Sequence, residues 1–116
     1  MSRDARAYLW DVLSAAEAID RFVAGVDAEA YARSEVIHSA VERKFEIIGE
    51  ALSQLAKRNA VLATAIPFLA QVVAFRNQLI HGYASVNSAT VWNVIQDSLP
   101  ALLEKVESLL DATGEA

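Results

Sequence analysis

Residues 35–58 read EVIHSAVERKFEIIGEALSQLAKR, and this stretch decides the fold. Apolar residues recur in it at intervals of three and four, which is the spacing of one face of an α-helix. They are Val36, Ile37, Ala40, Val41, Phe45, Ile48, Ala51, Leu52 and Leu55. Ser34 stands directly before the stretch as a candidate N-cap. The pattern therefore predicts a long amphipathic helix over residues 35–58.

One glycine, Gly49, lies inside this predicted helix. An interior glycine costs a helix about 1 kcal/mol relative to alanine. A close approach by another part of the chain would offset that cost, because glycine has no side chain to obstruct it. We therefore expect a neighbouring helix to pack closely against residue 49.

Helical spacing continues on the N-terminal side. Apolar residues at intervals of three and four predict a first helix over about residues 3–24, with Gly25 as its stop signal. Asp27 follows as an N-cap candidate for a short extra helix that runs through Arg33.

Two more helices are predicted on the C-terminal side. Pro67 suits the first turn of a third helix that runs to about His81, since a proline there loses no hydrogen bond. Asn87 or Ser88 caps a fourth helix. Pro100 lies inside that helix and must kink it or split it in two.

Short loops between four long helices favour an all-α, antiparallel, up-and-down four-helix bundle. The bundle carries the short extra helix after its first helix and a proline kink in its last one. With 116 residues, the chain is expected to form a single domain over residues 1–116. Residues from about 111 to 116 are expected to fray.

Composition excludes several classes of site. The chain has no Cys and only two His, so neither a disulfide framework nor a thiolate or all-His metal site can form. No metal-ligand spacing of the HExxH kind occurs, and no metal or cofactor is expected. The net charge of −5 gives no basic surface for duplex DNA, so contact with nucleic acid would have to be local.

A secretory signal is not expected either. The start, MSRDARAYLW, lacks the apolar core of a secretory signal. The longest uncharged stretch, residues 60–75, is shorter than the ~20 apolar residues that a membrane span needs. We therefore expect a cytoplasmic protein that does not enter a membrane.

The run RNQLIHGY, residues 76–83, gathers polar groups at the end of an otherwise apolar helix. At about 100° per residue, Asn77 and His81 lie about 40° apart and share a face. Arg76 and His81 lie about 140° apart on a straight helix, which is awkward for one shared ligand. A turn of the helix end at Gly82, or a second copy of the chain, would bring the two together.

These residue types suit the cleavage of RNA without a metal. Arg76 can hold a phosphate with paired donors, and His81 can move a proton near neutral pH. Such cleavage needs a base for the 2′-hydroxyl and a cation for the charge that builds on phosphorus. Asn77 can orient the imidazole or bind a phosphate oxygen, and the Tyr83 hydroxyl can bind RNA or be modified.

A purely structural interpretation of the same residues stays open, and the residue types alone favour it. Arg76 can pair with a glutamate, and a charged His81 interacts favourably with the C-terminal end of a helix dipole. Glu50 and Glu46 lie one turn apart on a helix face, where Glu50 can meet Arg43 or Arg76. If it is buried against Arg76, Glu50 would position the guanidinium. His38 is expected to be a surface or packed histidine.

The run R-N-x-x-x-H-x-Y resembles the signature of the HepT-like proteins of the HEPN superfamily. The segment ERKFEIIGEA is similar to the second-helix segment of that family, and IPF to its approach to the third helix. VW at residues 91–92 and DSLP at residues 97–100 resemble two further family elements. The likeness covers residues 5–110 in the family's order, and this ordered set is more specific than any single motif.

The resemblance implies a fold, an activity and partners. HEPN domains are all-α bundles that usually dimerise, placing two R-x4-H motifs in one cleft, and many are metal-independent ribonucleases. The HepT-like branch supplies the toxin of toxin–antitoxin pairs, whose antitoxin is an MNT-type nucleotidyltransferase that transfers AMP to the motif tyrosine in some systems. By this resemblance Arg76 and His81 form the catalytic pair, Asn77 is auxiliary, and Tyr83 is the adenylylation acceptor.

The expected function is therefore an endoribonuclease toxin, with RNA, the nucleotidyltransferase antitoxin and a second copy of the chain as partners. Two alternatives remain open. In the first, the chain is a non-catalytic helical module that binds a nucleotide or a nucleotidyltransferase partner. In the second, it is a purely structural helical dimer.

Overall fold

Helices make up all the regular secondary structure of residues 4–82 and 86–113, which are the residues that this computed structural model describes. The chain is thus all-α, as predicted. None of these helices combines the length and hydropathy that crossing a membrane requires. The seven helices within the described residues are α1 (Ala5–Phe22), α2 (Ala28–Arg33), α3 (Glu35–Arg58), α4 (Ala60–Ala63), α5 (Leu69–His81), α6 (Ser88–Asp97) and α7 (Leu99–Thr113).

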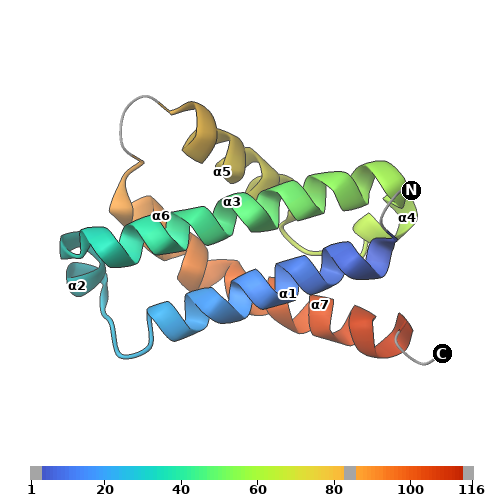
Figure 1. Cartoon of the computed structure of the whole chain (residues 1–116), viewed down its shortest axis with the longest axis horizontal. Coiled ribbons are helices and arrows are strands. Elements are labelled where there is room, and N and C mark those ends of the chain that lie inside the picture. The colour runs from blue at the N-terminus through green and yellow to red at the C-terminus, as the bar shows by residue number, and fades with distance from the viewer. Residues whose placement is uncertain (1–3, 83–85, 114–116) are drawn as a thin grey trace.

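The long helices run up and down beside one another (Figure 1). Helices α1 and α3 lie antiparallel at the centre, α5 packs along α3, and α7 packs along α1. Helices α6 and α7 together form the fourth arm of the bundle, and α2 closes one end against α3 and α6. This arrangement confirms the predicted antiparallel bundle with a short extra helix after the first.

Side-chain caps set where the helices begin. Asp27, Ser34 and Asn87 each accept a backbone N–H in the first turn of α2, α3 and α6, at 2.8, 3.1 and 2.7 Å. Asp27 and Ser34 were predicted as caps, and Asn87 as one of two candidates beside Ser88, because a short polar side chain there satisfies a donor that the helix leaves unpaired. Asp4 caps α1 in the same way at 3.1 Å, so the first helix begins at Ala5.

The approach to α5 differs from the prediction. Pro67 does not lie in the first turn, because Phe68 adopts a left-handed conformation with φ 63° and the helix begins only at Leu69. The unpredicted helix α4 also occupies part of this connection. Asn59 starts it, since its side chain accepts the N–H of Leu62 at 3.0 Å. The chain therefore makes a separate short helix and a turn before α5.

Pro100 splits the last arm rather than bending it. Helix α6 ends at Asp97 and α7 begins at Leu99, so Pro100 lies in the first turn of α7, where its missing N–H breaks no helical hydrogen bond. Helix α7 continues to Thr113, so residues 111–113, which were expected to fray, are helical. The buried side chain of Leu110 holds this last part of α7 to the core.

The hydrophobic core lies between α1, α3, α6 and α7, and α5 joins it through two buried residues, Val72 and Phe75. The rings of Phe75 and Phe45 meet edge to face with their centroids 5.2 Å apart. Such a contact fixes the position of one helix on another, beyond what buried area alone contributes. It places the next residue of α5, Arg76, directly over α3.

Gly49 provides the space for that residue. A Cβ atom added at Gly49 would overlap the Cβ of Arg76 and would lie 2.6 Å from its Cγ. The predicted close approach at Gly49 is therefore confirmed, and the group that approaches is the side chain of Arg76. Helix α5 can lie this close to α3 only because residue 49 has no side chain.

We expect Gly49→Ala to lower the free energy of unfolding by about 1–3 kcal/mol, the usual cost of forcing extra atoms into packed space. Helix propensity alone would have the opposite effect, about 1 kcal/mol of stabilisation. Urea unfolding measures the difference. Ser39→Ala, at an exposed position of α3, serves as the control and should change stability by less than about 0.5 kcal/mol. Equal or greater stability of Gly49→Ala would contradict the close approach.

Candidate active site

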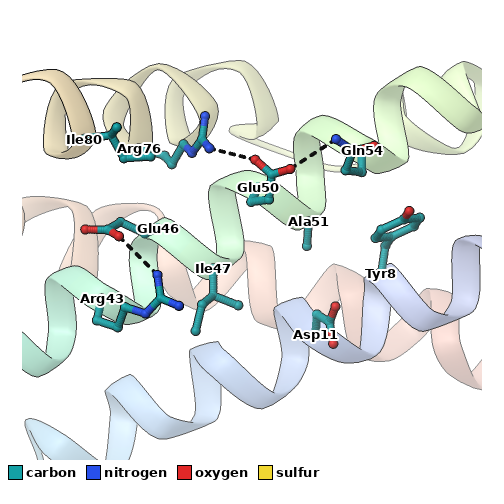
Figure 2. A pocket seen from close by; sticks show the side chains of 10 residues that line it. All are labelled: Tyr8, Asp11, Arg43, Glu46, Ile47, Glu50, Ala51, Gln54, Arg76 and Ile80. Carbon is teal, nitrogen blue, oxygen red and sulfur yellow. Dashed lines mark hydrogen bonds and ion pairs between the residues drawn. The ribbon is translucent and has the colours of Figure 1, made fainter. Parts of the chain in front are cut away.

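The guanidinium of Arg76 is held between α3 and α5. Its Nη2 donates to Oε1 of Glu50 at 2.7 Å, and its Nη1 donates to Oδ1 of Asn77 at 3.0 Å (Figure 2 shows the contact with Glu50). The Arg76 side chain is 25% exposed and that of Glu50 is 51% exposed. Of the two partners predicted for Glu50, the structure selects Arg76. Arg43 pairs instead with Glu46, at 3.2 Å.

Arg76 lines a hollow of about 260 Å³ between α1, α3 and α5 (Figure 2). Asp11, Glu46 and Glu50 place three carboxylates around it, against the guanidinium groups of Arg43 and Arg76. The carboxylates outnumber the guanidinium groups, so the hollow does not attract a polyanion by its net charge. A phosphate that binds Arg76 must compete with Glu50 for its donors.

His81 lies exposed at the end of α5 and lines a different hollow, together with Asn77 and residues at the start of α6. Arg76 and His81 thus face different hollows of one chain. The helix end does not relieve this separation: the N–H of Gly82 still donates to the carbonyl of Gln78 at 2.8 Å, so α5 keeps its regular geometry through His81. Asn77 lies near both residues. Its Oδ1 accepts a hydrogen bond from Arg76, and its side chain lines the same hollow as His81.

Two other expectations concern Tyr83 and metal binding. Tyr83 lies outside the described residues. Within residues 4–82 and 86–113, no group of three or more His, Asp or Glu side chains is arranged to hold a metal ion. Four of the predicted site residues, Arg76, Asn77, His81 and Glu50, lie among the described residues.

Three further residues join this site, of which sequence reasoning did not single out Tyr8 and Gln54. The Nε2 atom of Gln54 donates to Oε2 of Glu50 at 3.1 Å, and Nη2 of Arg58 lies 3.4 Å from Oε1 of Gln54. The Nε atom of Arg58 donates to the hydroxyl of Tyr8 on α1 at 3.0 Å. Glu50, Gln54 and Arg58 follow one another at intervals of four, and this helical spacing was the available signal.

His38 is packed, as expected, and does not line the hollow of Arg76. The ring centroids of His38 and Tyr31 lie 6.1 Å apart in an edge-to-face arrangement, and Nδ1 of His38 lies 3.8 Å from Oε2 of Glu42. Burial raises the pKa of the Glu42 carboxyl above its usual range, and it also raises the pKa of the Tyr31 hydroxyl. These groups share the end of the bundle formed by α2, α3 and α6.

The helical bundle and its polar run together define an all-α protein of the HEPN class. Within that class the chain belongs to the ribonuclease HepT-like family, whose pattern matches residues 12–109. The resemblance seen in the sequence to HepT-like proteins is thereby confirmed.

Named relatives cover nearly the whole chain. A protein of Methanocaldococcus jannaschii named "Putative RNase" is 32% identical over 93% of this chain and 92% of its own length. A protein of Thermococcus cleftensis named "Probable ribonuclease HepT" is 31% identical over 94% of this chain and 98% of its own length. No solved structure gave a significant match.

Proposed function

We propose that the protein is a metal-independent endoribonuclease that cuts RNA by attack of a 2′-hydroxyl on the adjacent phosphate. The observation that carries this proposal is the placement of Arg76 on α5, the helix that ends in His81. Hydrogen bonds to Glu50 of α3 and to Asn77 of α5 hold the Arg76 guanidinium in position. Family membership and relatives named as ribonucleases support an RNA substrate.

The chemistry assigns a role to each group. The 2′-oxygen loses its proton and forms a bond to phosphorus, while the bond to the 5′-oxygen breaks and that oxygen gains a proton. The products are a 2′,3′-cyclic phosphate and a free 5′-hydroxyl. His81 acts as the general base or the general acid, and Arg76 stabilises the charge on the phosphoryl oxygens. Asn77 orients these groups from its position between them.

We propose further that a second copy of the chain completes the site. Arg76 and His81 line different hollows of one chain, and a partner is the remaining way to bring the two kinds of group together. The surface beside Asn77 supports this, because it is a shallow hollow between α3 and α5 rich in small and apolar side chains. Its lining residues are Ser53, Ala56, Lys57, Leu69, Ala70, Val73, Ala74 and Asn77. A two-fold dimer would bring the same surface of each subunit together.

The biological role that we propose is that of a cytoplasmic toxin, paired with an MNT-type nucleotidyltransferase as its antitoxin. Tyr83 stands two residues after His81 in the sequence. Transfer of AMP to its hydroxyl would add a phosphate and a purine two residues from His81 in the sequence. The added bulk and negative charge would exclude RNA.

One observation favours a second candidate, a non-catalytic module that binds a partner or a nucleotide. Glu50 already occupies Arg76, and carboxylates outnumber guanidinium groups in that hollow. If RNA cannot displace Glu50, Arg76 and Glu50 are a structural pair and the polar run serves only for recognition by a partner.

The first prediction concerns cleavage of end-labelled total RNA in EDTA. We expect discrete products from the unmodified protein, and a loss of roughly 10²–10⁴ in rate for His81→Ala, because proton transfer then lacks its group. Arg76→Ala should lose activity as well, and circular dichroism should show that both variants keep their helices. Intact RNA with the folded, AMP-free protein would reject the nuclease and favour the second candidate.

The second prediction tests whether subunits share the site. Arg76→Ala and His81→Ala proteins are inactive alone, but subunit exchange between them should restore about a quarter of the unmodified activity, since half of the dimers then hold one complete site of two. Analytical ultracentrifugation confirms that dimers are present. If each chain carries its own complete site, the mixture stays as inactive as its components.

The third prediction concerns modification. After co-expression with its nucleotidyltransferase partner, the protein should gain the mass of one or more AMP groups, as measured by intact mass spectrometry. Tyr83→Phe should abolish the gain, because the accepting hydroxyl is absent. Tyr31→Phe is the matched control: Tyr31 is fully buried, and its loss should leave the added mass unchanged. AMP that persists on Tyr83→Phe would place the modification elsewhere.

A further inference from the structure

One face of α3 carries a continuous chain of hydrogen bonds that leads to Arg76. Glu50, Gln54 and Arg58 lie one turn apart on this face, and Figure 2 shows Gln54 and Arg76 on opposite sides of the Glu50 carboxylate. Arg58 is fixed at the far end by Tyr8, whose hydroxyl accepts its Nε–H and whose ring centre lies 6.0 Å from its guanidinium carbon. The chain of contacts therefore joins α1, α3 and α5.

An amide suits position 54 in this chain. Arg58 can only donate hydrogen bonds and an ionised Glu50 can only accept them, so a residue between them must accept on one side and donate on the other. Gln54 does both, since its Oε1 faces Arg58 and its Nε2 donates to Glu50. These two neighbours fix the orientation of the amide.

Glu50 meets Arg76 through one of its two oxygens. A carboxylate commonly binds a guanidinium through both oxygens, with two parallel hydrogen bonds. Here Oε2 of Glu50 accepts from Gln54 and Oε1 accepts from Nη2 of Arg76, so one hydrogen bond rather than two joins the carboxylate to the guanidinium. Consistent with this, the buried Nε of Arg76 has no hydrogen-bond partner among the described residues.

We propose that Gln54 is a positioning residue for RNA cleavage: it keeps Glu50 in a single contact with Arg76, so that a phosphate of the RNA can displace that contact. This inference rests on the proposed function. Without Gln54, the Glu50 carboxylate is free to turn and take the Nε and Nη2 edge of Arg76 with both oxygens. Arg76 would then be withheld from RNA, and binding would weaken.

Steady-state cleavage of a short labelled RNA tests this proposal with Gln54→Met, which keeps the length of the side chain and removes both hydrogen bonds. We expect KM to rise about tenfold while kcat changes less than about twofold, the pattern of a lost binding interaction. In a Glu50→Ala background the same substitution should change KM by less than about twofold, because its effect passes through Glu50. Gln96→Met, at an exposed position of α6, is the matched control and should leave both constants unchanged.

Gln54→Glu gives a second variant in case the first does not fold. It keeps the acceptor for Arg58 and loses the donor to Glu50, so KM should rise in the same direction. The ¹⁵N–¹H signal of the Arg76 Nε provides a readout independent of RNA. It should shift downfield in Gln54→Met, as the N–H gains an acceptor.

The outcomes separate the two proposals. If the unmodified protein and Arg76→Ala both leave RNA intact, the proposed function fails and the role of Gln54 fails with it. If RNA is cut and Arg76→Ala is inactive, the function stands. In that case an unchanged KM for Gln54→Met, or an equal rise in the Glu50→Ala background, overturns the role of Gln54 alone. A lower melting temperature with an unchanged KM also overturns it, because it shows a structural role only.

Discussion

The close approach of α5 to α3 at Gly49 is the constraint on which the site depends. The stem of Arg76 occupies the space that a side chain at residue 49 would fill, and its guanidinium reaches Glu50 from there. The edge-to-face contact between Phe45 and Phe75 secures the same pair of helices from within the core. Packing of apolar groups and placement of a charged group are therefore parts of a single interface between two helices.

The charged groups at this interface determine which partners Arg76 binds. An arginine that is only 25% exposed is stable when its donors are occupied, and Glu50 and Asn77 occupy two of them. The same partners compete with any phosphate for Arg76. In the function that we propose, RNA would bind by replacing Glu50 at Arg76, and the chain of contacts from Tyr8 through Gln54 would set how tightly Glu50 holds.

Local rules were enough to predict much of the fold. Ser34 caps α3 as expected, and the apolar spacing of residues 35–58 gives a helix with those bounds, because capping and helical periodicity depend only on residues a few positions apart. The start of α5 could not be predicted in this way. Proline is compatible with a first turn, but Phe68 adopts a left-handed conformation and α5 begins only after it, which no local pattern in the sequence indicates.

The sequence by itself determined the long helices, their antiparallel bundle and the presence of Arg76, Asn77 and His81 on one helix end, since helical spacing and short loops are read along the chain. Tertiary structure decided the rest. It selected Glu50, 26 residues away, as the partner of Arg76, and it added Gln54 to the site. It also placed Arg76 and His81 in different hollows. Contacts between helices depend on how whole faces pack together, and no local pattern in the sequence specifies which polar groups meet there.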